Sequence, residues 1–111
     1  MKHYEPKIIL KTLDLYKDFY IEIKKWPKPE KYSIGKRCED LILDIFKNLL
    51  AASRNKEKLR YLKKANLELQ IFKHLIRMIK ELNIMKNKKY IFFFTKILEI
   101  GKMIGGWIKF V

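Results

Sequence analysis

The stretch of sequence that decides the fold is IGKMIGGWIKFV, residues 100–111, which holds three glycines within an otherwise helical pattern. A glycine inside a helix costs about 1 kcal/mol relative to alanine, so it is accepted mainly at a helix end or where another backbone comes close. Gly101 and Gly105 are four residues apart and share one helical face beside Trp107. Two interpretations stay open: a fraying helix end, or a surface where helices or subunits pack closely. We favour the second.

Working outward from this stretch, the whole chain follows the periodicity of amphipathic helices, at about residues 6–25, 33–53, 56–82 and 88–109. Pro27 and Pro29 end the first helix, because proline disfavours helical geometry in the residue before it, and they leave 28–32 as a short linker. The predicted N-caps of the later helices are Ser33, Asn55 and Asn87. Short connections make neighbouring helices antiparallel. The sequence therefore predicts one all-α domain over residues 1–111, an up-down-up-down antiparallel four-helix bundle.

The charge of the chain is strongly basic and unevenly placed. The formal net charge is +14 over 111 residues. Residues 1–55 hold 12 basic and 8 acidic side chains, whereas residues 56–111 hold 14 basic and 4 acidic ones. This imbalance favours a polyanionic partner, either nucleic acid or an acidic membrane surface. The alternative is that the lysines only solvate helix faces.

The chain carries few residues suited to catalysis or metal binding. Cys38, the one cysteine, falls on the apolar stripe of its helix, so we expect a buried thiol. Asp14, Asp18 and Glu22 follow helical spacing and are interpreted as a solvated acidic face. No phosphate-binding loop or paired-histidine motif occurs, and His3 and His74 are far apart in the sequence. We therefore expect a binding protein, not an enzyme, with no cofactor and no metal.

The membrane and targeting signals are also weak. No run of 18 apolar residues occurs, and the first residues do not resemble a signal peptide. We expect a cytoplasmic protein without a membrane partner. The alternative of a helical protein that lies on an anionic membrane surface stays open.

The third predicted helix carries a second apolar row, made of Leu67, Ile71 and Met78, on the side away from its core residues. A monomeric bundle buries one side of each helix, so such a row is a candidate subunit interface, although scattered exposed apolar residues are common. The segment IFFF, residues 91–94, is apolar around most of its helix, which again favours assembly. The predicted oligomer interface comprises Leu67, Ile71, Met78, Phe92, Gly101, Gly105 and Trp107.

A basic stripe lies between the two apolar rows of the same helix. The predicted surface for nucleic acid and for a protein partner is formed by Arg37, Lys63, Lys73, Arg77 and Lys80. The alternative is that these side chains are only solvated, with Arg77 paired to Glu81 four residues further on.

Two motifs carry a family resemblance. Residues 101–109, GKMIGGWIK, resemble the carboxy-terminal signature of the accessory variability determinant proteins of diversity-generating retroelements. Residues 26–37, WPKPEKYSIGKR, resemble the junction between the first two helices of that family, which it shares with proteins encoded in intervening sequences of ribosomal RNA genes. The latter proteins usually follow their second helix with an Asn-Ile-Ala-Glu-Gly type segment, from which residues 48–53, NLLAAS, depart. The retroelement family is therefore favoured.

This resemblance, which covers residues 13–109, implies more than the composition does. Members of the family assemble into a pentameric barrel and bind the reverse transcriptase of the retroelement and nucleic acid. They are required for mutagenic retrohoming, in which a template RNA is copied with adenine-directed errors. Arg37 and Arg77 stand at positions that match basic residues of the family pattern. The alternative is an RNA-binding or structural bundle of the intervening-sequence type, which has no reverse transcriptase partner.

Overall fold

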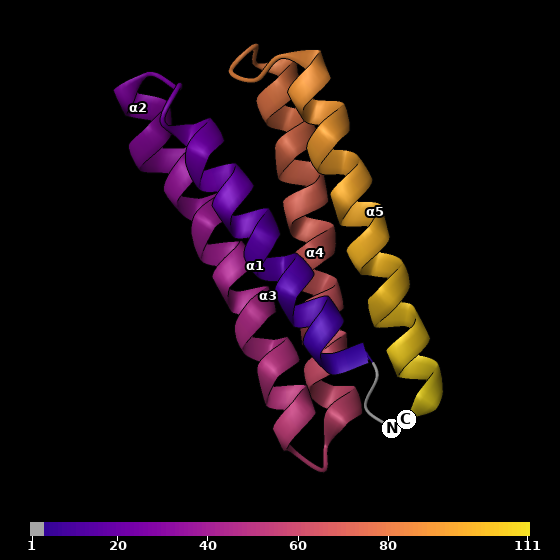
Figure 1. The fold of residues 1–111 in the computed structure, drawn as a ribbon. Coiled ribbons are helices and arrows are strands. Elements are labelled where there is room, and N and C mark those ends of the chain that lie inside the picture. Colours follow the sequence, from indigo (N-terminus) through magenta and orange to yellow (C-terminus); the bar gives the residue numbers. More distant parts are fainter. Residues whose placement is uncertain (1–3) are drawn as a thin grey trace.

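The computed structural model describes the backbone of residues 4–111 and the side chains of residues 7–111. Its elements are α1 (Tyr4–Ile23), α2 (Lys28–Glu30), the π-helical turn η1 (Lys31–Gly35), α3 (Lys36–Arg54), α4 (Lys58–Glu81) and α5 (Asn87–Phe110). Because α2, η1 and α3 follow one another without a break, residues 4–111 form four long helices and no strand. Neighbouring helices run antiparallel (Figure 1). The predicted all-α bundle is confirmed, and its assembly into a pentamer stays a prediction.

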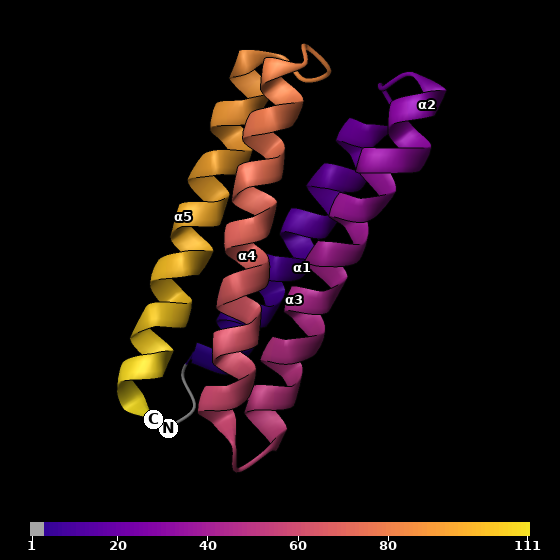
Figure 2. The same cartoon turned by 180° about the vertical axis from the view of Figure 1, so that it is seen from behind.

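The four helices form an elongated bundle of 43 × 22 × 19 Å. α1 packs on α3 and α5, and α4 packs on the same two helices from the opposite corner, with the closest packing between α3 and α4. Figure 2 shows the same arrangement from behind. One end of the bundle carries α2 and the α4–α5 connection, and the other carries the α3–α4 turn and the end of α5.

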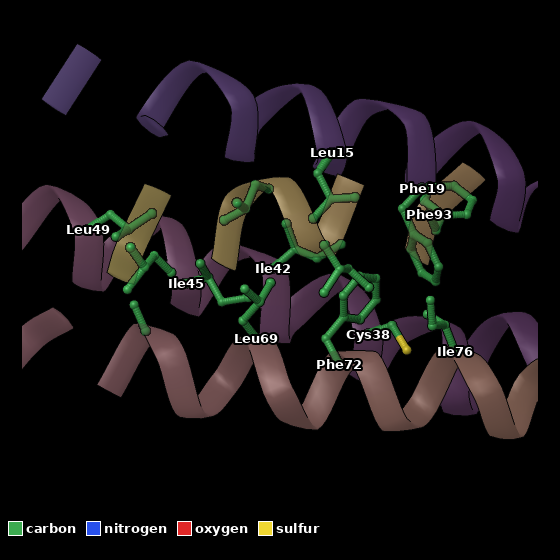
Figure 3. Close-up of a cluster of buried hydrophobic side chains, with 14 of the residues drawn as sticks. Leu15, Phe19, Cys38, Ile42, Ile45, Leu49, Leu69, Phe72, Ile76 and Phe93 are labelled. Carbon is green, nitrogen blue, oxygen red and sulfur yellow. The ribbon is translucent and has the colours of Figure 1, made fainter. Parts of the chain in front are cut away.

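One apolar core runs through the bundle and draws on every long helix (Figure 3). Phe19 of α1 lies at its centre, with edge-to-face contacts to Phe72 of α4 and Phe93 of α5, each at a ring-centroid distance of 5.4 Å. Trp26 closes the cluster, 5.6 Å from the Phe19 ring. Burying one such side chain stabilises the fold by about 1.5–3 kcal/mol, so this core holds the two helical hairpins together.

The helix ends differ from the predicted ones. The second long helix begins at Lys28, not at Ser33, because proline fits the first helical turn, where its missing N–H would be unpaired in any case. The Ser33 hydroxyl donates a hydrogen bond to the Pro29 carbonyl at 2.6 Å and caps nothing. Asn55 donates to the Ala51 carbonyl at 2.8 Å, so it closes the end of α3 and does not start α4. Asn87 is the first residue of α5, and no side chain caps that helix.

The π-helical turn η1 depends on Gly35. A Cβ atom at this position would lie 3.2 Å from the Glu30 carbonyl oxygen and 3.4 Å from the Ile23 side chain. Since both distances are tight, the absence of a side chain lets the widened turn pack against the end of α1. A π-helical turn is rare in proteins and is found mostly as a single turn within an α-helix.

The prediction of a solvated acidic face on the first helix is wrong for Glu22. The carboxylate of Glu22 is buried and accepts a hydrogen bond from the Trp26 indole N–H at 3.1 Å. Its second oxygen lies 3.8 Å from the Lys25 ammonium. The physical reason is that a buried indole N–H needs an acceptor, which apolar periodicity alone does not reveal. Asp14 remains exposed on the surface, as expected.

The prediction for Cys38 is confirmed. Its thiol is fully buried in the core, and burial raises its pKa to about 12. Such a thiol stays protonated at neutral pH and is a poor nucleophile. Over residues 4–111, no helix combines the length and the apolar character needed to cross a bilayer.

Candidate nucleic-acid and subunit interfaces

Four of the five predicted basic residues share the exposed part of α4. Lys63 and Arg77 are exposed, and Lys73 and Lys80 are half-buried. The ammonium of Lys80 lies 4.9 Å from the ring centroid of Tyr90 on α5, so this part of the stripe borders the α4–α5 seam. The four basic residues therefore lie along α4, three of them between Lys73 and Lys80 and Lys63 about three turns earlier.

The electrostatic partners of the stripe are few. Arg77 pairs with Glu81 through Nε and Oε2 at 3.2 Å, as the alternative interpretation expected. Both side chains are exposed, so the pair contributes little to stability and is readily exchanged for another anion. Within residues 7–111, neither Lys63 nor Lys73 has a carboxylate at ion-pair distance. The stripe thus offers cations that the subunit itself does not neutralise.

Arg37 stands apart from the α4 stripe. It is exposed on the first turn of α3, and α3 lies on the other side of α4 from α5. The side chains of α4 that face α3 are different ones, as the hydrogen bond from Asn48 of α3 to Glu68 at 2.8 Å shows. The order of the helices around the bundle therefore separates Arg37 from the basic residues of α4. This order cannot be predicted from the sequence pattern of single helices.

The apolar row of α4 is exposed, as the interface prediction requires of it. Leu67 exposes 62% of its surface, and Ile71 and Met78 expose 41% and 40%. Leu82, one turn beyond Met78, is 60% exposed and extends the row. Sequence reasoning missed Leu82, although its four-residue spacing from Met78 could have indicated it. Whether a second copy covers this row stays a prediction.

The four interface residues predicted on α5 lie in different environments. Trp107 is 4% exposed and packs in the core of its own subunit, so it offers almost no surface to a second copy. Phe92 is exposed on the flank of α5 nearest α1, because the Lys96 ammonium that covers its ring at 4.8 Å also lies 3.7 Å from Asp18 of α1. Gly105 has no atom of the described part of the chain within 4 Å of the place where a Cβ would be.

Gly101 is half-buried beside α4. A Cβ there would lie 3.5 Å from Leu69 Cδ2, which is an ordinary van der Waals distance. The packing within one subunit therefore requires glycine neither here nor at Gly105. Whether a second copy packs on this glycine face stays a prediction.

An exposed tyrosine was missed because its segment was interpreted as a linker. Tyr32 lies in η1 and exposes 72% of its surface. The exposure of Tyr32 could have been predicted only if residues 28–35 had been recognised as helical, and the two prolines argued against that.

The arrangement is suited to binding by charge and apolar contact. Among residues 7–111, no three His, Cys, Asp or Glu side chains come close enough together to hold a metal ion. In the described part of the chain, the ion pairs that join different helices are Lys11–Glu99 at 2.7 Å and Lys96–Asp18 at 3.7 Å, both between α1 and α5. The Lys11 ammonium holds the pKa of Glu99 below its usual value.

Comparison with known proteins agrees with the resemblance carried by the two motifs. A family model described as bAvd-like matches residues 8–111, which is almost the whole chain. No curated protein and no solved structure gives a significant match. The chain therefore belongs to the bAvd-like family, that of the bacteriophage accessory variability determinants.

Proposed function

We propose that this protein is a non-catalytic accessory subunit of a diversity-generating retroelement that binds the reverse transcriptase and nucleic acid during mutagenic retrohoming. The observation that carries this proposal is the family match over residues 8–111, since the family is of the accessory kind found in retroelements. The net charge of +14 supports a polyanionic partner such as the template RNA or its DNA copy.

The proposed contact surface for both partners is the α4 stripe. Lys63 and Lys73 have no carboxylate partner within the described chain, and Arg77 is held only by a weak surface pair. Each phosphate contact releases counterions, so the logarithm of the affinity should fall with the logarithm of the salt concentration by about 0.7 per contact on a single strand. Such contacts carry no sequence information directly, so we expect little sequence preference.

A double charge reversal tests this surface. Lys63→Glu with Arg77→Glu should weaken binding to template RNA and to the reverse transcriptase, and should lower the salt slope by about 1.4 if both contact phosphate. The matched control is Lys17→Glu with Lys47→Glu, which changes the net charge equally at lysines that are 75% and 73% exposed on α1 and α3. Circular dichroism checks that both variants remain helical. If the stripe variant and the control variant bind RNA and the reverse transcriptase equally well, the α4 stripe is not the contact surface.

Co-purification with the reverse transcriptase encoded beside this gene tests the protein partner. Stable association that the Lys63→Glu, Arg77→Glu variant loses supports the retroelement role. Binding of RNA without any association with the reverse transcriptase would instead favour the intervening-sequence type of protein.

We further propose that the subunits form a homo-oligomer, a pentamer by analogy with the family. The apolar row of α4 and the Phe92 region lie on different sides of the subunit, which suits a head-to-tail contact repeated around a ring. Ile71→Glu should dissociate the assembly, because it places a charge in a contact that otherwise buries an isoleucine. Ile21→Glu, at a 57% exposed position on α1, is the control.

Mixing two variants tests the head-to-tail geometry. A subunit with Ile71→Glu keeps an intact Phe92 side, and a subunit with Phe92→Glu keeps an intact Ile71 side. Each variant alone should sediment as a monomer, and an equimolar mixture should stop at a heterodimer. A wild-type protein that sediments as a monomer at micromolar concentration would refute the oligomer altogether.

A further inference from the structure

The positive charge of the chain is concentrated away from the middle of the bundle. Residues 24–37 hold six basic side chains and one acidic one, so their net charge of +5 exceeds the +4 of the whole first half of the chain. Residues 80–89 hold four basic side chains and one acidic one. Both segments lie at the same end of the bundle, with α2 and the α4–α5 connection (Figures 1 and 2). These 24 residues, named the basic end, carry +8 of the total of +14.

Tyr32 is the aromatic side chain that the basic end exposes most. It exposes 72% of its surface, and no other described side chain engages its ring or its hydroxyl. Elsewhere in η1, Ile34 packs against the core and Gly35 is buried against the end of α1. An unpartnered tyrosine at the surface of a π-helical turn contributes little to folding, so its ring is available to a ligand.

Four basic residues lie within five positions of Tyr32 along the helix: Lys28, Lys31, Lys36 and Arg37. Lys28 and Arg37 are exposed, and neither has an ion-pair partner within residues 7–111. Lys31 is half-buried, and it too is without a carboxylate at ion-pair distance in this range. Lys36 pairs with Asp40 at 3.0 Å on the surface. The aromatic ring therefore lies within one or two helical turns of several cations that the protein does not neutralise.

A second exposed tyrosine comes from α1. It is Tyr20, which lies near the end of α1 that leads into α2. Tyr20 is 47% exposed, and the Lys24 ammonium lies 4.7 Å from its ring centroid.

We propose that the basic end binds unpaired nucleotides of a single-stranded nucleic acid, with a base stacked on Tyr32 and with Lys28, Lys31 and Arg37 contacting the phosphates. Aromatic rings set among cations bind single strands because every base has a π face, and this stacking tolerates any sequence. In a duplex the bases are already stacked and paired, so the tyrosine gains nothing there.

The opposite end of the bundle is also basic around residues 54–60, but its tyrosine is not comparable. Tyr61 is half-buried, with Arg60 and Lys64 over its ring at 5.3 and 6.0 Å.

The inference deepens the proposed function, on which it rests, by naming an unpaired strand as the preferred nucleic acid.

Fluorescence anisotropy with two labelled RNAs tests the inference, using the full chain. One RNA is an oligouridylate of about 20 nucleotides, and the other is a duplex of the same length. Tyr32→Ala should weaken binding of the oligouridylate by between about 5- and 150-fold, the range that loss of one base–aromatic stack corresponds to, and should leave duplex binding and the salt slope unchanged. Tyr32→Phe should bind the oligouridylate as the wild type does, because it keeps the ring.

The matched control is Phe110→Ala, which removes a 75% exposed aromatic residue at the other end of the bundle. Unchanged oligouridylate binding by Tyr32→Ala would overturn the inference while leaving the proposed function in place. The same holds if Tyr32→Ala weakens both RNAs equally, or if Phe110→Ala weakens the oligouridylate as much. A wild-type protein that binds neither RNA would overturn the inference together with the nucleic-acid part of the proposed function.

Discussion

Alanine at Gly105 and at Gly101 should stabilise the isolated subunit and weaken its assembly. Each exchange within a helix gains about 1 kcal/mol, because alanine loses less backbone entropy than glycine on folding. The added methyl group meets no described atom within 4 Å at Gly105 and makes an ordinary contact with Leu69 at Gly101, so the described packing gives no steric penalty to offset the gain. The two positions are neighbours on one helical face, so their effects are not assumed to add, and each alanine is measured singly.

The assay separates folding from assembly by working in an Ile71→Glu background, in which the subunit should be monomeric. Each alanine should raise the thermal midpoint by about 4 °C there. In the wild-type background, sedimentation equilibrium should show a larger dissociation constant, because two methyl groups would stand where a second copy comes close. Gly35→Ala is the internal contrast, since its Cβ would crowd the Glu30 carbonyl oxygen at 3.2 Å and should offset the gain.

Two outcomes would refute this reasoning at different points. A lower midpoint for Gly105→Ala in the monomeric background would mean that α5 does not present this position to open space. A higher midpoint together with an unchanged dissociation constant would mean that the glycine face is not part of the interface.

Three further predictions concern the core and the titratable groups. Phe19→Ala should lower the free energy of unfolding by about 3–5 kcal/mol in urea titrations, because it empties the site where three helices meet; a loss below about 1 kcal/mol would contradict the central position of this ring. Cys38, with its pKa raised to about 12, should resist alkylation by iodoacetamide at pH 8 until denaturant is added, and rapid labelling of the native protein would show that the thiol is accessible. Because the pKa of Glu99 is lowered mainly by its hydrogen bond from Lys11, the stability that this pair contributes is present above the unfolded pKa and is lost as the pH falls through the folded pKa. Glu99→Gln should therefore lower the urea midpoint slightly at pH 7, and by less as the pH falls and the carboxyl becomes protonated. An equal effect at neutral and at acid pH would exclude the ion pair as its cause.

Much of the fold was predictable because it depends on local properties of the chain. The spacing of apolar residues gave four helices and placed Cys38 inside, since a helix face is set by residues three and four apart. The exact helix starts were not predictable, because Pro29 suits a first turn as well as it suits a linker. Glu22 was placed wrongly for a related reason: its hydrogen bond to Trp26 appears only once both are buried.

The candidate surfaces show the same division. Exposure of Leu67 and Ile71 followed from their position opposite the core face of the same helix, so sequence alone indicated it. Trp107 was expected at a subunit interface, but it lies in the core of its own subunit. The reason is that α5 packs on both α1 and α4, so the face of α5 that carries Trp107 is buried.

The sequence by itself determined that this is a basic, all-helical chain of the bAvd-like family with more apolar surface than one bundle buries. Only the tertiary structure decided which of its basic residues lie together. It separates Arg37 from the α4 stripe, to which the sequence had assigned it, and it brings residues 24–37 to the same end of the bundle as the α4–α5 connection. The physical reason is that helical periodicity fixes which face of a helix is buried, whereas the order and level of the helices around the core depend on how the large side chains of all four pack together.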